Sequence, residues 1–156
     1  LIHRVFVETF ENGWGIVSYL NEQTNGMTLY TQKGSPILPQ LKEYRNWKEL
    51  LSNTKFLKDF LSDDPDRKVV GGNANSSRAS QITGSNWLAI GDAAIAFDPL
   101  SSHGISNVIY CANAASNAIE SRRSNGAIAP FQDYDDTLSQ IFNEYLKQKS
   151  KLYEAQ

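Results

Sequence analysis

The stretch WLAIGDAAIAFDPLSSHGISNVIYCANAASNAI, from Trp87 to Ile119, most constrains what this chain can fold into. It predicts a short apolar strand over 86–92 that ends in Gly91-Asp92, followed by a sharp turn over 98–104. A helix over 104–123 then carries small residues that let it lie close against its neighbours: Ala112, Ala114, Ala115 and Ala118. Strand, turn and helix in this order are typical of an α/β layer, and the whole run is more specific than the Gly-Asp pair within it.

This arrangement has chemical consequences at both ends of the turn. Gly91 permits a ligand or another backbone to approach closely, and Asp92 presents a carboxylate suited to the hydroxyl groups of a sugar or ribityl chain. A helix that begins near Gly104-Ile105 has free N–H groups and the positive end of the helix dipole. That end can stabilise negative charge on a bound ring or oxyanion.

The segment before this stretch is predicted to be mainly β. Alternating residues over 2–10, the apolar run over 14–20 and residues 27–32 indicate three strands of an antiparallel meander. Glu11-Asn12-Gly13 is expected to form the first turn, and Asn25-Gly26 the second.

The rest of the chain is predicted to be mainly helical. Three- and four-residue spacing of Leu, Trp, Tyr and Phe over 41–62 indicates one or two amphipathic helices, and a strand over 68–70 then leads into a polar loop. Asn125-Gly126 is expected to end the helix over 104–123. Pro130 is expected to open a last helix with this apolar stripe: Phe131, Tyr134, Leu138, Ile141, Phe142, Tyr145 and Leu146.

Composition excludes several classes of function. The 156 residues carry a net charge of −2 and no basic block, so neither nucleic acid nor a membrane is an expected partner. One cysteine forbids an internal disulfide and favours a reducing, cytoplasmic setting. Two distant histidines give no metal-ligand spacing, so no metal is expected. The chain opens directly in strand-like sequence, as expected for a part cut from a longer protein.

One glycine pair resembles a dinucleotide fingerprint and is rejected. Gly13-Trp14-Gly15-Ile16-Val17-Ser18 is one residue short of GxGxxG and lies between predicted strands. A dinucleotide loop must follow a strand and open a helix. The sequence therefore predicts no phosphate loop within this chain.

The run GDAAIAFDPLSSHGISNVI closely resembles the second flavin-binding motif of FAD-dependent aromatic hydroxylases and their relatives. Those relatives include flavin-dependent halogenases and the maturation flavoproteins of quinone-cofactor enzymes, and this version is most similar to these two branches. The resemblance implies an α+β chain that is part of an α/β flavoprotein. Its parts would be a substrate-side antiparallel sheet with packed helices over 1–66, the last strand and helix of the FAD-binding domain over 67–126, and a C-terminal helix over 127–156.

The resemblance also implies roles for particular residues. Gly91 and Asp92 would meet the ribityl chain of FAD, while the N–H groups of Gly104 and Ile105 would face the N1/O2 edge of the flavin. The turn between them would line the isoalloxazine ring through Pro99, Leu100, Ser101, Ser102 and His103. Trp14 is the substrate-side candidate, and no catalytic residue is predicted.

The function that the resemblance implies is a C-terminal portion of an FAD-dependent monooxygenase-like oxidoreductase. It would hydroxylate an aromatic small molecule or peptidyl side chain through a flavin C4a-hydroperoxide, with the missing N-terminal half holding the ADP part of FAD. Electrons would come from NAD(P)H or a partner reductase. A flavin-dependent halogenase is the alternative, outside the tryptophan group because only Trp14 of the Trp-x-Trp-x-Ile-Pro signature is present. A fragment with no tight ligand or activity of its own is the third possibility.

Overall fold

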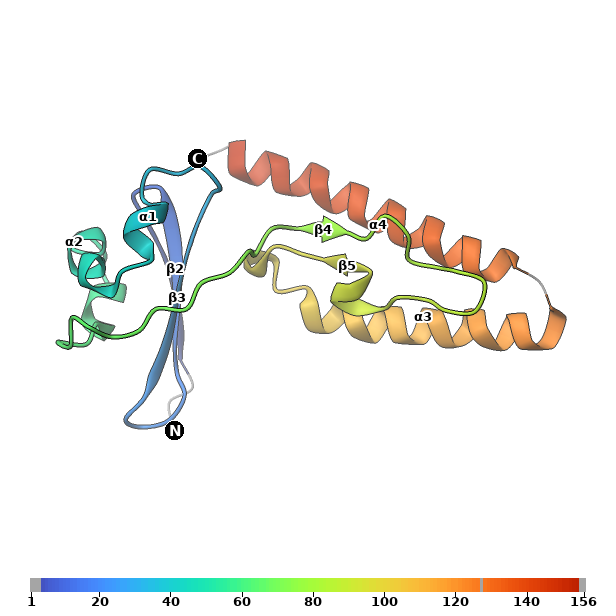
Figure 1. The fold of residues 1–156 in the computed structure, drawn as a ribbon, viewed down its shortest axis with the longest axis horizontal. Coiled ribbons are helices and arrows are strands. Elements are labelled where there is room, and N and C mark those ends of the chain that lie inside the picture. The colour runs from blue at the N-terminus through green and yellow to red at the C-terminus, as the bar shows by residue number, and fades with distance from the viewer. Residues whose placement is uncertain (1–3, 127, 155–156) are drawn as a thin grey trace. The chain divides into compact units, whose positions relative to one another are not determined.

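The computed structural model describes residues 4–126 and 128–154. The chain forms two compact units, one ending at Gly72 and the other beginning at Asn73 (Figure 1). Antiparallel strands and helices occur in both units, so the predicted α+β class is confirmed. The functional assignments of 1–66, 67–126 and 127–156 stay predictions.

The first unit begins with the predicted meander. Strands β1 (Val5–Phe10), β2 (Gly13–Tyr19) and β3 (Asn25–Thr31) pair antiparallel in the order β1-β2-β3. The first turn lies where it was expected, with Asn12 at a φ of 62°. Asparagine tolerates this left-handed conformation better than most residues, which explains why the turn forms there.

The predicted second turn at Asn25-Gly26 is wrong. Both residues belong to β3, where Asn25 pairs with Tyr19 and Gly26 pairs with Ser18. The loop instead covers residues 20–24, and the Asn21 side chain accepts a hydrogen bond of 2.9 Å from the Gln23 N–H. This Asx turn at Asn21 therefore reverses the chain four residues before the predicted Asn25-Gly26 turn.

The core of the first unit lies on one face of the meander. Val17, paired with Phe6 and Met27, is fully buried together with Leu51 and Leu57. Gly15 shares this face, and a Cβ there would stand 2.7 Å from a methyl of Leu29 and 2.8 Å from one of Leu57. The missing side chain therefore makes room for leucines of the core.

The predicted long helices over 41–62 are wrong in extent, because the segment forms short turns of helix. The Trp47 indole N–H donates to the Leu41 carbonyl at 2.9 Å, and the Thr54 hydroxyl donates to the Leu51 carbonyl at 2.7 Å. These side chains satisfy carbonyls that a continuing helix would have used. The pieces are α1 (Leu38–Leu41), α2 (Trp47–Leu50), and two 3-10 turns at Tyr44–Asn46 and Leu57–Phe60.

A carboxylate joins the sheet to this helical segment. Glu8 on β1 accepts hydrogen bonds from the backbone N–H groups of Lys55, Phe56 and Leu57, the last two at 2.8 and 3.1 Å. These donors are free because they precede and open a 3-10 turn. Desolvation alone would raise the pKa of Glu8, but the three N–H donors and nearby Lys58 hold it below its usual value.

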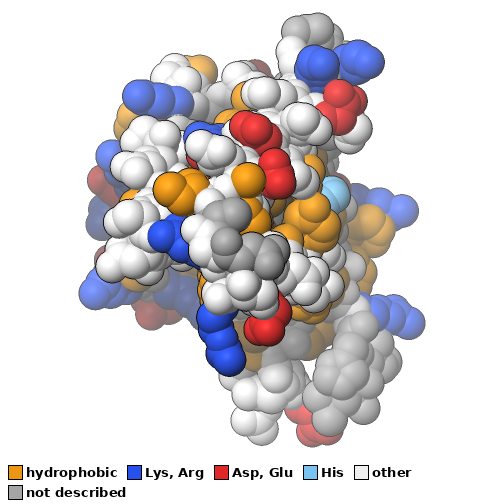
Figure 2. Space-filling view, turned by 90° about the vertical axis from the view of Figure 1, so that its right-hand side faces the viewer, with side chains coloured by type: hydrophobic (Ala, Val, Ile, Leu, Met, Phe, Trp, Pro, Cys, Tyr) orange, Lys and Arg blue, Asp and Glu red, His pale blue; other side chains and the backbone are white. Residues whose placement is uncertain are grey.

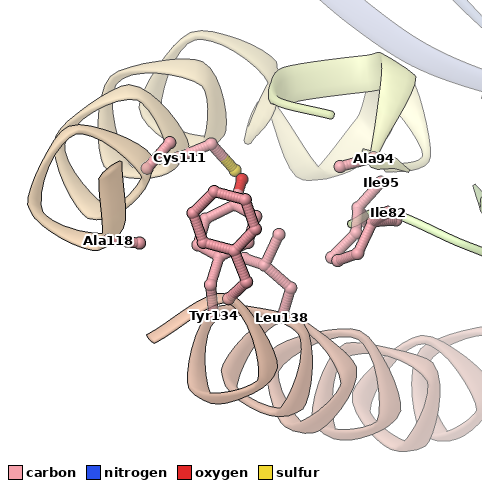
Figure 3. Packing of buried hydrophobic residues seen from close by; sticks show 9 residues of the cluster. Ile82, Ala94, Ile95, Cys111, Ala118, Tyr134 and Leu138 are labelled. Carbon is pink, nitrogen blue, oxygen red and sulfur yellow. The ribbon is translucent and has the colours of Figure 1, made fainter. Parts of the chain in front are cut away.

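The second unit is built on two long helices, α3 (Gly104–Asn125) and α4 (Ala129–Glu154), which lie side by side (Figure 1). Gly126 ends α3 with a φ of 69° and donates to the Arg122 carbonyl, as predicted. A two-stranded ribbon of β4 (Ser77–Arg78) and β5 (Ile95–Ala96) accompanies them. The buried residues that hold these elements together are Ile82, Ala94, Ile95, Cys111, Ala115, Ala118, Phe131, Tyr134 and Leu138 (Figure 3).

Two predicted strands of this region differ in the structure. Residues 68–70 form no strand, and the segment 86–92 forms a single bridge, between Leu88 and Thr83, before it enters a 3-10 turn at Gly91. The predicted apolar stripe of α4 packs as expected for Phe131, Tyr134 and Leu138, whereas Leu146 is exposed. Within residues 4–126 and 128–154, no helix combines the length and apolar character needed to cross a membrane.

Candidate functional site

The site begins with a tight turn at Gly91. This residue is buried, has a φ of +57° and opens a 3-10 turn, Gly91–Ala93, that packs on α3. A Cβ at Gly91 would stand 3.0 Å from a methyl of Val108 and 3.8 Å from its Cα. Both the dihedral angle and the close approach therefore require glycine, as the sequence predicted for a point where two backbones meet.

Asp92 follows directly and is exposed. Its carboxylate makes no hydrogen bond or ion pair with any other part of residues 4–126 or 128–154. Because Gly91 packs against Val108, the backbone turn that carries Asp92 lies against the N-terminal half of α3. An unpaired carboxylate in this position can accept hydrogen bonds from ligand hydroxyl groups.

The predicted turn after β5 is held by its own polar groups. Asp98 caps the 3-10 turn Pro99–Ser101 by accepting from the Leu100 N–H at 3.0 Å, and the Ser101 hydroxyl donates to the Asp98 carbonyl at 2.7 Å. Ser102 then adopts the left-handed conformation, with a φ of 54°. Pro99, Leu100 and Ser102 are exposed on the resulting loop.

His103 joins this turn to α3. Its ring Nδ1 lies 2.6 Å from the Ser101 carbonyl, which can only accept, so this nitrogen carries the proton. The side chain is exposed, and no side chain in the described part of the chain caps the N-terminus of α3. Gly104 has open space around its Cβ position, and Ile105 is 76% exposed. The first N–H groups of α3 are therefore available as donors.

Asn107 is a site residue that the sequence analysis missed. It is buried, and its amide donates to the Ile95 carbonyl at 3.0 Å while its oxygen accepts from the Cys111 thiol at 3.3 Å. These bonds fix the first turn of α3 to β5. The signal in the sequence was a polar residue at the i−4 position of a buried cysteine within a small-residue helix.

Two residues of α4 that the sequence analysis gave other roles also reach the turn. The Tyr145 hydroxyl accepts from the Asp98 N–H at 2.8 Å, although Tyr145 was expected only in the apolar stripe. The Lys149 ammonium lies 3.0 Å from an Asp98 carboxylate oxygen, although the chain around it was expected to be a polar tail.

Trp14, the substrate-side candidate, belongs to the first unit. It lies on the face of the meander opposite the core, because β2 alternates and Val17 points into the core. Its ring stacks on Tyr30 with centroids 4.1 Å apart and an angle of 16° between planes. The structure thus gives Trp14 a place on the outer face of the sheet, and the substrate role stays a prediction.

One face of α3 is apolar and open to solvent. Ile105, Ile109 and Ile119 are 76%, 65% and 50% exposed, on the side of the helix away from buried Cys111, Ala115 and Ala118. Hydrophobic side chains are visible at the surface of the molecule in Figure 2. In the described part of the chain no group of three or more His, Cys, Asp or Glu side chains is arranged to hold a metal ion.

The geometry therefore defines a turn-and-helix site with a free carboxylate and free backbone donors, suited to a polar organic ligand. Comparison with curated proteins finds similarity to "Putative FAD-dependent oxidoreductase LodB" of Marinomonas mediterranea, at 24% identity over 152 residues. The match covers 96% of this chain and 40% of the relative, so the chain spans less than half of the relative's length. It supports a relationship to FAD-dependent oxidoreductases. No family model matches the chain. No solved structure matches it.

Proposed function

We propose that this chain is the C-terminal portion of an FAD-dependent, monooxygenase-like oxidoreductase, and that its second unit faces the ribityl chain and ring of the flavin. The observation that carries this proposal is an unpaired Asp92 carboxylate on a turn that packs on α3, the helix whose N-terminus is uncapped. The similarity to a relative named as a putative FAD-dependent oxidoreductase, over 96% of this chain, supports the FAD-dependent oxidoreductase part of the proposal.

The donor set fits this part of FAD. A carboxylate accepts from the hydroxyl groups of a ribityl chain, and helix N–H groups donate to a carbonyl oxygen or ring nitrogen. Gly91 brings Asp92 against α3, and the open space at Gly104 leaves the first N–H groups accessible. Pro99, Leu100 and Ser102 are exposed on the loop between them, where they would line the ring.

These residues bind and orient, and the helix end acts electrostatically. The N-terminus of α3 carries partial positive charge, which stabilises negative charge on a reduced ring more than on a neutral one. When bound, FAD supplies the redox chemistry with O2. The substrate would be an electron-rich aromatic group on a small molecule or peptide, with the outer face at Trp14 as its candidate surface.

The whole protein would need more than these residues. The match covers 40% of the relative, so we assign the ADP half of FAD to a part of the full-length protein outside this chain. NAD(P)H or a partner reductase would supply the electrons. The exposed isoleucines of α3 would be covered by another part of the full-length protein.

The test is FAD binding to the full-length protein, followed by flavin fluorescence and absorbance. Asp92→Ala should weaken FAD binding about 10- to 100-fold, because charge-assisted hydrogen bonds to the ligand are lost. Asp136→Ala is the matched control, since Asp136 is an exposed aspartate of α4 in the same unit. Absence of FAD binding in the wild-type protein would contradict the flavoprotein proposal.

A product assay separates hydroxylation from halogenation. The reduced, FAD-loaded full-length protein is exposed to O2 with aromatic acids and peptides, with and without chloride or bromide. Products heavier by one oxygen atom are expected in both conditions. Halogenated products that require the halide would instead assign the protein to the halogenase alternative.

A further inference from the structure

A polar cluster joins the C-terminal half of α4 to the start of the turn. The Tyr145 hydroxyl accepts from the Asp98 N–H at 2.8 Å and lies 2.7 Å from the Ser76 hydroxyl. The Lys149 ammonium donates to the same serine at 3.0 Å and pairs with Asp98 at 3.0 Å. Side chains from one helix thus hold both the backbone and the carboxylate of a single turn residue.

The Asp98 carboxylate divides its two oxygens between two tasks. Oδ1 accepts from the Leu100 N–H and so shapes the 3-10 turn, while Oδ2 faces the Lys149 ammonium. The Asp98 side chain is only 13% exposed, so its charge depends on a partner more than a surface carboxylate would. Loss of Lys149 would remove this ion pair at the point where the turn begins.

The same face of α4 also contacts the segment that precedes Gly91. The Tyr134 hydroxyl donates to the Ala89 carbonyl at 2.9 Å, two residues before Gly91. Tyr134 and Tyr145 are 11 residues apart, which is about three helical turns, so both lie on one side of the helix. One helix face therefore contacts the chain before Gly91 and the chain before Pro99.

We propose that Tyr145 and Lys149 are positioning residues that set the turn Asp98–His103 against the bound ligand. This inference rests on the proposed function for the identity of that ligand. Neither residue needs to touch it, because both act through Asp98, whose cap determines where Leu100 to His103 stand. Phe97, the residue before Asp98, packs edge-on against the Tyr145 ring, with centroids 4.7 Å apart. Tyr145 therefore contacts two consecutive residues at the start of the turn.

The experiment uses the full-length protein and three measurements: backbone hydrogen exchange without FAD, FAD titration, and thermal unfolding. Lys149→Met should accelerate exchange in residues 98–106 about 10-fold and weaken FAD binding about 3- to 10-fold. Tyr145→Phe should act in the same direction, since it removes the acceptor of the Asp98 N–H. Lys149→Arg should restore most of both effects.

Lys147→Met is the matched control. Lys147 is an exposed lysine of α4 whose ammonium lies 3.7 Å from Glu144. The substitution should change neither exchange in the turn nor FAD binding. A merely structural role for Lys149 predicts faster exchange throughout the second unit and a lower melting temperature, with no effect concentrated in 98–106. That result, or an unchanged turn in Lys149→Met, overturns the proposal.

The outcomes also separate this inference from the proposed function. If the wild-type protein binds no FAD, the flavoprotein proposal fails, while the exchange measurement still decides whether α4 positions the turn. If the wild type binds FAD and Lys149→Met binds it equally well, the flavoprotein proposal stands and the positioning role is wrong.

Discussion

The Asn107 side-chain amide donates a hydrogen bond of 3.0 Å to the backbone carbonyl of Ile95, where both residues are buried. Asn107→Ala removes the donor to the Ile95 carbonyl. It also removes the oxygen that accepts from the Cys111 thiol. We expect the free energy of unfolding to fall by about 1–3 kcal/mol, measured by urea denaturation. Asn113→Ala, on the exposed side of the same helix, is the control and should cost little. Equal costs for the two variants would contradict the role of Asn107.

Gly91→Ala should destabilise the second unit through two separate effects. The φ of +57° costs an L-residue about 1–2 kcal/mol, and the new Cβ would stand 3.0 Å from a methyl of Val108. Adding Val108→Ala to Gly91→Ala should recover only the stability lost to the steric contact. The cost of the positive φ at residue 91 would remain. Denaturation of the single and double variants checks this.

Gly104→Ala is the comparison for that pair. A Cβ at Gly104 would meet nothing within 4 Å, and Gly104 has no positive φ. Stability should therefore stay the same or rise slightly, since alanine is the better helix former. A loss as large as that of Gly91→Ala would show that the local geometry of Gly91 is not the cause.

Glu8 should make the stability of the first unit depend on pH. Because three backbone N–H donors hold its pKa below the usual value of 4.5, its contribution is present above pH 4.5 and is lost as pH falls through the lowered pKa. Wild-type protein should therefore be more stable than Glu8→Gln at pH 7, with the difference shrinking towards pH 3. Glu11→Gln, an exposed glutamate of the adjacent turn, should show no such trend in denaturation at the two pH values.

The first unit contains one buried tryptophan, Trp47, and one on the outer face of the meander, Trp14. Trp47 is buried and donates to the Leu41 carbonyl, so Trp47→Ala should cost about 3–5 kcal/mol. Trp14 stacks on Tyr30 outside the core, and Trp14→Ala should cost about 0.5–1.5 kcal/mol. Denaturation followed by circular dichroism measures both. Similar losses would place Trp14 in the core and weaken its candidacy as a substrate-side residue.

The strands and the long helix with regular residue patterns could be predicted from the sequence. Alternation identified the three strands of the meander, and small residues with a terminal glycine identified α3 and its end at Gly126. In 41–62 the spacing indicated several side chains that are buried, including Leu41, Trp47 and Leu51, but it also included exposed Phe56 and did not indicate the length of the helices. The helices are short because the Trp47 and Thr54 side chains hydrogen-bond to backbone carbonyls. Residue propensities do not predict such bonds.

The candidate site could be located from the sequence, but the side chains that hold it in place could not. Gly91 and Asp92 were expected to end a strand and instead open a 3-10 turn that packs on α3, while Asp98 caps the expected loop. The contacts of Tyr145 and Lys149 with Asp98 join residues 47 or more positions apart, and no local pattern predicts them. In the same way, Asn107 looked like one polar residue among several until its partner on β5 was known.

Cys111 gives this architecture a built-in reporter. It is the one cysteine of the sequence, and its thiol is fully buried between α3 and Tyr134, whose pKa burial raises (Figure 3). A thiol-specific reagent can therefore react only when the packing of α3 on α4 opens. Since the first unit has no cysteine, the labelling rate follows the opening of the second unit alone, and any ligand that binds the folded second unit should slow it.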